Sequence, residues 1–215
     1  MNAANEKEAP LKTIIVGAGG IAQKHAEALT RIAGVEIAAV LDPRESNAKS
    51  LAEKYGGRVI PRLEEALDDV CMIHLLTPPS KRLDYARLAV QAGKHIFCEK
   101  PVAVTLDDAM ELKRLTCESG VFFMTGFNMR FRPGYLMLRE DVLSGKLGSI
   151  ISVWSHRIGP GAGFNAPLGD SWRTEPGLVC GMTIESLSHD IDMIRGLGLE
   201  IEKVSAWVYG SRTDL

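Results

Sequence analysis

The hydrophobic pattern of the first 125 residues alternates between two kinds of segment. Short runs rich in valine, isoleucine and leucine are separated by longer amphipathic stretches with helical spacing. The short runs predict strands, at 12–16, 35–41, 58–60, 70–76, 95–98 and 121–125. The longer stretches predict helices, which follow residue 19 and cover 46–55, 63–67, 81–92 and 106–119. Alternating strands and helices are typical of a doubly wound parallel sheet, so we predict an α/β fold with a Rossmann domain at residues 10–127.

After residue 127 the pattern predicts a second, α+β domain at 128–215. Apolar runs predict strands at 149–155 and 204–209, and helical spacing predicts helices at 135–143 and around 185–195. The chain ends shortly after the last of these strands. Because a sheet of so few strands leaves edges and an apolar face exposed, we expect a partial domain that associates or dissolves poorly as an isolated fragment.

A glycine-rich turn directly follows the first strand. It has the pattern G-x-G-x-x-A, formed by Gly17, Ala18, Gly19, Gly20, Ile21 and Ala22. Because glycine has no side chain and accepts positive φ, the amides of such a turn can approach a pyrophosphate, and the helix that follows adds a favourable dipole. Glycine-rich turns are common, so the turn alone is weak evidence, but its position after a strand predicts a dinucleotide site.

Asp42 follows the second strand at the spacing where dinucleotide-binding proteins hold the ribose hydroxyls. A carboxylate there favours NAD, because it repels the 2′-phosphate of NADP. Arg44 lies two residues further on and can accommodate that phosphate, so NADP stays open as the cofactor. The simpler alternative is that Asp42 only starts a turn with Pro43.

Two polar segments lie at the carboxyl ends of predicted strands, where ligands of open α/β sheets bind. Thr77 and Pro78 follow one strand, and Glu99 and Lys100 follow the next. A lysine that is partly desolvated beside a positive nicotinamide ring has a lowered proton affinity, which suits proton exchange with a substrate hydroxyl. The alternative is an ordinary solvated lysine at a strand end.

A third candidate site lies on the helix predicted around 185–195. Glu185, His189 and Asp192 are four and three residues apart and therefore share one helix face. A carboxylate one turn before a histidine can orient the imidazole for acid/base chemistry. A solvated face with an incidental ion pair is the alternative. We predict no metal site, because this face lacks further ligands.

Composition narrows the class of protein. The 215 residues carry a net charge of −2 with acidic and basic residues interspersed, so we expect neither a nucleic-acid nor a membrane partner. The four cysteines show no paired or metal-type spacing, and the N-terminus lacks a signal sequence. These features predict a reduced, cytoplasmic protein.

The motifs together resemble one known family. They occur in the family's order: the glycine turn, Thr77-Pro78-Pro79, the segment Gly93-Lys-His-Ile-Phe-Cys-Glu99-Lys100-Pro101, Asn128-x-Arg130-Phe-x-Pro133, Trp172-Arg173, and Glu185-x-x-x-His189-x-x-Asp192. The chain resembles the glucose–fructose oxidoreductase and inositol dehydrogenase (Gfo/Idh/MocA) family of NAD(P)-dependent oxidoreductases from about residue 12 to its end.

The resemblance implies roles for individual residues. Lys100 acts in catalysis, His189 contacts the substrate hydroxyl or relays its proton, and Glu185 assists from a position that is often aspartate in the family. Cofactor contacts are implied at Thr77, Pro78 and Glu99, and substrate or cofactor contacts at Asn128, Arg130, Trp172 and Arg173. Arg82 is a departure, since members commonly have histidine there, and we expect it to alter local packing. Members are longer homo-oligomers, with an open-faced, mainly antiparallel sheet in the second domain.

Three functions are therefore compared. The first is a dehydrogenase that transfers hydride between nicotinamide and a secondary hydroxyl of a sugar, polyol or related small molecule. The second is a nicotinamide-dinucleotide-binding protein without turnover. A nucleotide-sugar epimerase comes last, because the Tyr-x-x-x-Lys pair typical of that class does not occur in the chain.

Overall fold

The computed structural model describes residues 9–158, 171–175, 177–178 and 180–207. It divides the chain into two compact units, which we call the first unit (Met1–Thr125) and the second unit (Gly126–Leu215).

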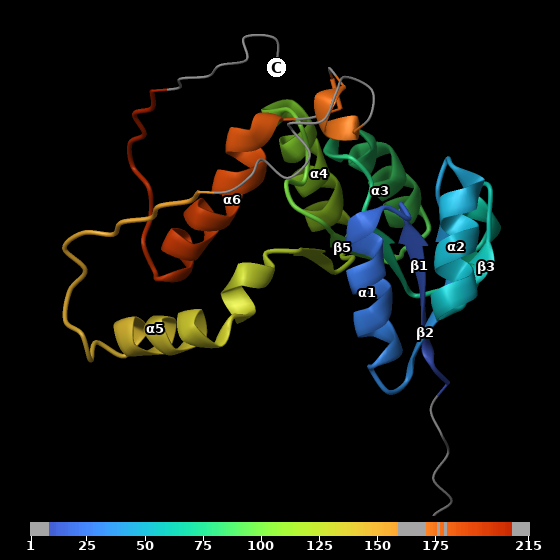
Figure 1. Cartoon of the computed structure of the whole chain (residues 1–215), viewed down its shortest axis with the longest axis horizontal. Helices are drawn as coiled ribbons and strands as arrows, with labels where there is room; N and C mark the ends of the chain where they lie inside the picture. The colour runs from blue at the N-terminus through green and yellow to red at the C-terminus, as the bar shows by residue number, and fades with distance from the viewer. Residues whose placement is uncertain (1–8, 159–170, 176, 179, 208–215) are drawn as a thin grey trace, which may run out of the picture. The chain divides into compact units, whose positions relative to one another are not determined.

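A six-stranded parallel sheet forms the centre of the first unit (Figure 1). Its strands are β1 (Leu11–Val16), β2 (Val35–Leu41), β3 (Arg58–Val59), β4 (Met72–Leu75), β5 (His95–Cys98) and β6 (Phe123–Thr125). They lie in the order β3-β2-β1-β4-β5-β6, and every neighbouring pair is parallel. The predicted doubly wound sheet is confirmed, and its order reverses between β1 and β4.

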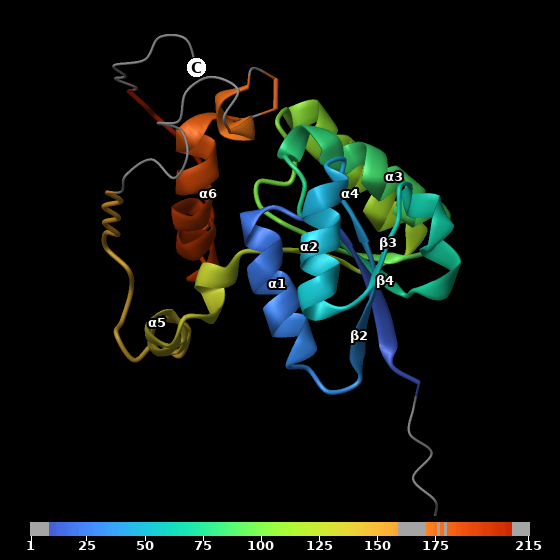
Figure 2. The same cartoon turned by 45° about the vertical axis from the view of Figure 1, so that its right-hand side comes forward.

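Helices cover both faces of this sheet. They are α1 (Gly20–Thr30), α2 (Glu45–Tyr55), α3 (Arg82–Gln91) and α4 (Leu106–Ser119). Successive residues of a strand point to opposite faces. Accordingly, Ile15 packs in a core with residues of α1 and α2, whereas Ile14 and Val16 pack with residues of α3 and α4. Figure 2 shows the two helix pairs on opposite sides of the sheet.

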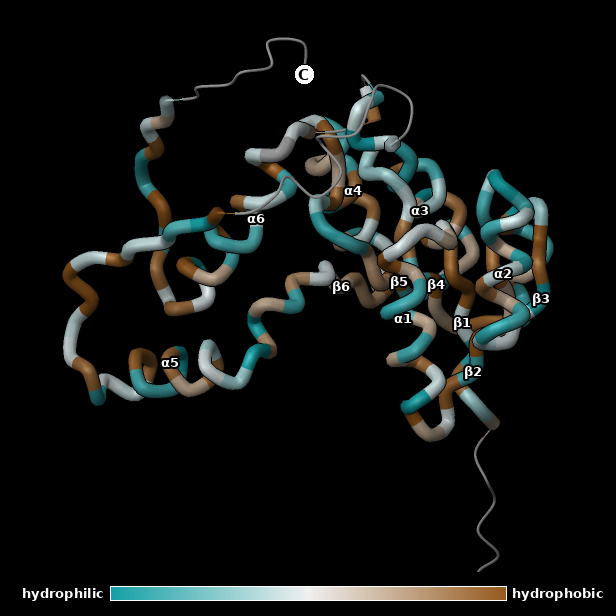
Figure 3. The backbone as a smooth tube through the Cα atoms, in the orientation of Figure 1, coloured by the Kyte–Doolittle hydropathy of each residue, from teal (hydrophilic) through white to brown (hydrophobic). Residues whose placement is uncertain are grey.

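The central strands are apolar because both of their faces are covered. Ile14, Ile15 and Val16 of β1 are fully buried, as are Ile73 and Leu75 of β4. In Figure 3 the strands of the first unit are accordingly mostly brown. Burying one such side chain contributes about 1.5–3 kcal/mol, so these strands stabilise the unit through their buried residues.

Local signals set the ends of several helices. At the start of α4 the Thr105 hydroxyl accepts a hydrogen bond from the Asp108 amide at 3.1 Å, and α4 ends at Gly120 in the left-handed conformation. The helix predicted at 63–67 is instead two short 3-10 turns, η1 (Leu63–Glu65) and η2 (Leu67–Asp69). The helix predicted from residue 81 is preceded by another such turn, η3 (Pro79–Lys81), whose first residue is a proline.

The second unit is helical in its described residues. It contains α5 (Pro133–Leu143), α6 (Gly181–Gly196) and the 3-10 turns η4 (Asn128–Phe131) and η5 (Trp172–Thr174). Both predicted helices are confirmed. The Tyr135 hydroxyl of α5 donates to the Met193 carbonyl of α6 at 2.8 Å, which ties the two helices together.

The strand predicted at 149–155 is wrong. This segment forms no strand, and neither do residues 204–207; residues 208–209 lie outside the described part. Ile151 and Trp154 are 98% and 94% exposed. An apolar run becomes a strand only when a neighbouring strand receives its backbone hydrogen bonds, and the described residues of this unit supply none.

The described residues contain no candidate for a membrane-crossing helix. None of their helices combines the required length with a sufficiently apolar composition.

Candidate functional site

The glycine turn lies between the ends of three strands. The Gly17 amide donates to the Leu41 carbonyl at 2.7 Å, and the Leu76 amide donates to the Val16 carbonyl at 2.8 Å. Gly17 has a φ of +97°, and a Cβ added to it would lie 2.8 Å from the Thr77 amide nitrogen. The residue is therefore required to be glycine by its backbone conformation and by the close approach of the backbone that follows β4.

Gly19 and Gly20, in contrast, lie beside open space. Apart from its immediate chain neighbours and the backbone of α1, a Cβ on either residue would meet no atom of the described chain within 4 Å, so this space is open. Gly19 caps α1 without a side-chain hydrogen bond, and the first turn of the helix has no acidic side chain. An open surface at a helix N-terminus fits an anionic pyrophosphate. Ala22 is fully buried, which allows α1 to pack closely on the sheet.

Asp42 lies beside this turn. Its Oδ2 accepts a hydrogen bond from the Ala18 amide at 2.7 Å, and its Oδ1 accepts one from the Arg44 amide at 2.8 Å. The carboxylate therefore joins the end of β2 to the glycine turn, whereas the Arg44 residue is exposed. A carboxylate at this place fits the ribose of a dinucleotide.

The ends of β4 and β5 are joined to each other. The Glu99 amide donates to the Leu75 carbonyl at 3.0 Å, and Glu99 is only 7% exposed. Its Oε2 accepts the Lys100 amide at 3.0 Å. Thr77 is buried, Pro78 and Lys100 are half-buried, and the bond between Lys100 and Pro101 is cis. The structure thus brings the first-unit candidates to the same edge of the sheet.

His25 of α1 is a site neighbour that the sequence did not reveal as such. Its Nε2 lies 3.1 Å from Glu99 Oε1. Burial raises the pKa of Glu99, but hydrogen bonds from His25 and the Lys100 amide, with the nearby charges, outweigh it and hold the pKa below its ordinary value. The helical spacing contained the signal, because His25 follows the sheet-facing Ala22 by three residues.

His74 of β4 lies behind this pair. It is 6% exposed, its ring stacks on Phe97 at 5.2 Å, and it meets the His25 ring edge-on at 5.8 Å. Neither of its ring nitrogens has a hydrogen-bond partner within the described chain. Burial, and secondarily the charge of His25, lowers the pKa of His74 to about 4. The ring is therefore neutral at physiological pH.

The second-unit candidates form two ion pairs. Asp192 of α6 accepts two hydrogen bonds from Arg130, both at 2.6 Å. Glu185 is 4% exposed and accepts a hydrogen bond from Arg173 at 3.1 Å. The Arg173 guanidinium also lies over the Trp172 ring, 4.3 Å from its centroid. Both carboxylates of the predicted helix face are thus bound to arginines that the resemblance had singled out.

His189 lies on the same helix, and its ring meets the ring of Phe127 edge-on at 6.1 Å. Asn128 begins η4. Lys100 belongs to the first unit, whereas Glu185 and His189 belong to the second. Within the described residues, no three histidine, cysteine, aspartate or glutamate side chains are grouped as metal ligands would be.

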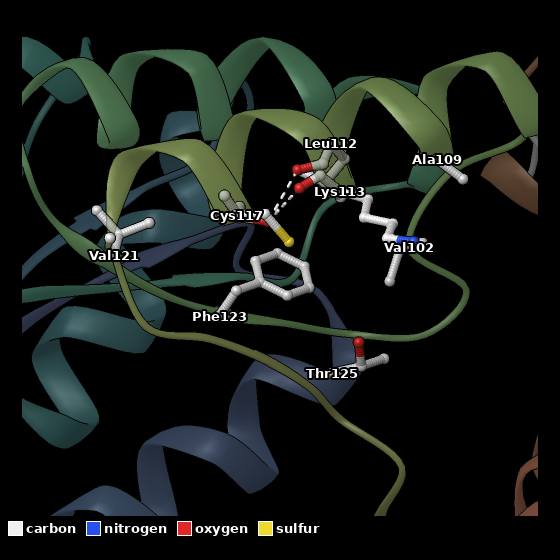
Figure 4. Close-up of a pocket in the computed structure, with 10 residues that line it drawn as sticks. Val102, Ala109, Leu112, Lys113, Cys117, Val121, Phe123 and Thr125 are labelled. Carbon is white, nitrogen blue, oxygen red and sulfur yellow. Dashed lines mark hydrogen bonds between the residues drawn. The ribbon is translucent and has the colours of Figure 1, made fainter.

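A pocket of about 540 Å³ lies between α4 and β6 (Figure 4). Its lining includes Val102, Leu112, Cys117 and Phe123. It contains none of the predicted site residues, and we assign it no role.

One known protein family matches the part of the chain that carries the glycine turn, Asp42 and Lys100. Residues 11–127 match GFO_IDH_MocA, an oxidoreductase family with an NAD-binding Rossmann fold. The chain belongs to this family. The predicted resemblance is confirmed, and the family description agrees with the predicted cofactor, NAD.

Relatives of the family were found by sequence and by structure. The chain is 32% identical to glucose-6-phosphate 3-dehydrogenase of Bacillus subtilis over 66% of its own length and 41% of the relative's. It is 31% identical to inositol 2-dehydrogenase of Rhizobium meliloti over 85% of its own length and 53% of the relative's. The structure of myo-inositol 2-dehydrogenase from Lactobacillus plantarum superimposes with a TM-score of 0.78 at 23% identity, covering 87% of this chain and 56% of that one. The chain therefore spans about half the length of the relatives it matches.

Proposed function

We propose that the protein is an NAD(P)-dependent oxidoreductase that transfers hydride between nicotinamide and a secondary hydroxyl of a sugar, a polyol or a related small molecule. The observation that carries the proposal is the meeting of four strand ends at one edge of the sheet. There the open glycine turn, the carboxylate of Asp42 and the segment Glu99–Lys100 come together beside the switch point between β1 and β4. Dinucleotides bind at this place in open α/β sheets.

The geometry of the glycine turn and of the strand ends supports the proposed cofactor contacts. The turn from Gly17 to Ala22 holds the pyrophosphate, and Asp42 accepts hydrogen bonds from the ribose hydroxyls, which favours NAD over NADP. Thr77, Pro78 and Glu99 shape the nicotinamide pocket. The bound dinucleotide supplies the hydride acceptor, and the protein supplies position and proton exchange.

Lys100 is the proposed proton acceptor for the substrate hydroxyl. It follows Glu99, whose carboxylate is held in its charged form by His25 and the Lys100 amide. In the second unit we assign proton relay to His189, with Glu185 beside it on α6. The hydrogen bond from Arg173 holds the side chain of Glu185 in a fixed position.

Asn128, Arg130, Trp172 and Arg173 are the proposed substrate contacts. Of these, Arg130 and Arg173 are already held by carboxylates of α6, so they present their remaining donors from fixed positions. The substrate class is supported by the relatives, whose names refer to a sugar phosphate and to inositol. A homo-oligomeric state, which rests on the family resemblance, and a cytoplasmic location, which rests on the spacing of the four cysteines, complete the proposal.

The test is the appearance of NADH absorbance when the protein is mixed with NAD and each member of a panel of inositols, glucose and glucose 6-phosphate. Lys100→Met removes the proposed base, and Lys12→Met is the matched control, because Lys12 is exposed near the start of β1. We expect turnover in the wild type and in Lys12→Met, and a loss of at least about a hundredfold in Lys100→Met.

Three results would contradict parts of the proposal. Undiminished turnover in Lys100→Met would remove Lys100 from the chemistry. Dinucleotide binding without turnover of any panel member would favour a binding protein without catalysis. Absence of dinucleotide binding would overturn the proposal as a whole.

A further inference from the structure

Arg82 is a buried cation between the two segments that flank the proposed site. It is the first residue of α3 and is 3% exposed. In the described part of the chain no other lysine or arginine is buried. The sequence predicts only altered packing at this position, so the burial of a charge there needs a separate explanation.

The guanidinium of Arg82 donates to backbone carbonyls of both segments. Its Nε and Nη2 donate to the Thr77 carbonyl, at 2.9 and 2.7 Å. Its Nη1 donates to the carbonyls of Glu99 and Pro101. Thr77 follows β4, and Glu99 and Pro101 are the residues on either side of Lys100. One planar side chain therefore joins the two strand-end segments.

Packing alone does not account for this charge. An apolar side chain of similar size fills space without the cost of removing a cation from water. Three carbonyl oxygens that converge on one point, in contrast, repel one another and need several donors in a fixed arrangement. Arginine provides five donors in one plane, whereas an imidazole provides two and a lysine provides a single point charge.

We infer that Arg82 is a positioning residue, which fixes the backbone on both sides of Lys100 and holds that segment against the Thr77–Pro78 turn. The inference rests on the proposed function for its effect on turnover. Its structural part does not, because the two segments are joined by Arg82 whether or not the protein is an enzyme.

The first measurement is local hydrogen exchange of the backbone amides in Arg82→Met, which keeps most of the volume and removes the donors. Arg87→Met is the matched control, because Arg87 lies on the same helix and pairs at the surface with Glu111 at 3.0 Å. We expect exchange in segments 76–81 and 99–103 to rise by at least about tenfold in Arg82→Met and to stay unchanged in Arg87→Met. Equal exchange in the wild type and Arg82→Met would overturn the inference.

The second measurement separates positioning from cofactor binding. We expect kcat of Arg82→Met to fall by about a hundredfold, since small displacements of a reacting group have effects of this size. The affinity for ADP-ribose, which reports on the glycine turn and Asp42, should change by less than about twofold because Arg82 contacts neither. A loss of ADP-ribose binding equal to the loss of kcat would show general damage and overturn the inference.

Rescue provides the third measurement and covers the case in which Arg82→Met does not fold. Arg82→Ala leaves a space of guanidinium size, and added guanidinium ion at low concentration should restore slow exchange in both segments, and turnover with it. Sodium chloride at the same ionic strength is the control. No restoration by guanidinium, or equal restoration by sodium chloride, contradicts the inference.

If the wild type binds dinucleotide but turns over no substrate, the exchange measurements still decide the role of Arg82, and only the proposed function fails.

Discussion

The buried ring of His74 predicts by how much the free energy of unfolding falls in weak acid. The ring is neutral in the folded protein because burial lowers its pKa to about 4. In the unfolded chain a histidine has a pKa of about 6.5. Between these values the unfolded chain binds a proton that the folded protein does not, so acid favours unfolding.

The size of the effect follows from the two pKa values. The whole difference between the two pKa values corresponds to about 3 kcal/mol in the free energy of unfolding. Between pH 7 and pH 5, His74 alone should lower that free energy by about 2 kcal/mol. His25, whose ring meets that of His74, and Glu99, which lies against His25, are present in both proteins compared below. Because the pKa of Glu99 is lowered in the folded protein, its own contribution is complete above the ordinary carboxyl pKa and is lost as the pH falls from there through the lowered pKa.

The assay compares the wild type with His74→Phe, which keeps a flat ring against Phe97 but cannot be protonated. Urea unfolding should be followed by far-ultraviolet circular dichroism, because Trp154, Trp172 and Trp207 all lie in the second unit and do not report on the first. We expect the wild type to lose about 2 kcal/mol more than His74→Phe between pH 7 and pH 5. Equal losses, or an NMR titration of His74 near pH 6.5, would refute the reasoning.

Two further predictions concern the glycine turn and its carboxylate. Gly17→Ala should destabilise the first unit by at least about 2 kcal/mol in urea unfolding, because the new alanine has a positive φ and its Cβ meets the backbone of Thr77. A change below about 0.5 kcal/mol would contradict that account. Asp42→Asn should reduce the ratio of NADH affinity to NADPH affinity by about tenfold in fluorescence titrations, because it removes the charge that repels the 2′-phosphate. An unchanged ratio of the two affinities would show that Asp42 does not select the cofactor.

The parts of the fold that depend on short-range pattern were predictable from the sequence. The run at 70–76 is apolar because β4 is covered on both faces, and the spacing from the glycine turn to Asp42 reflects one strand-helix-strand unit. The absence of a strand at 149–155 was not predictable, because strand formation depends on a neighbouring strand that composition does not reveal.

The candidate site was predictable in its residues but not in all of its contacts. Glu99 and Lys100 stand out because they follow a strand. Arg82, however, reaches carbonyls 5, 17 and 19 residues away, and no periodicity encodes such contacts. The pairing of Arg130 with Asp192 spans 62 residues and is equally hidden in the sequence.

The most direct test of the central claim is NAD binding to a variant in which the open space over the glycine turn is filled. Gly19→Val places a side chain where no protein atom lies within 4 Å of the added Cβ, so the fold should tolerate it. Gly134→Val makes the same change at another open, exposed glycine and serves as the control. Calorimetric titration should show one dinucleotide per chain in the wild type and in Gly134→Val, and an affinity at least about tenfold weaker in Gly19→Val, with unchanged urea unfolding. Equal affinity in Gly19→Val and the wild type would contradict the claim that the dinucleotide binds on this turn.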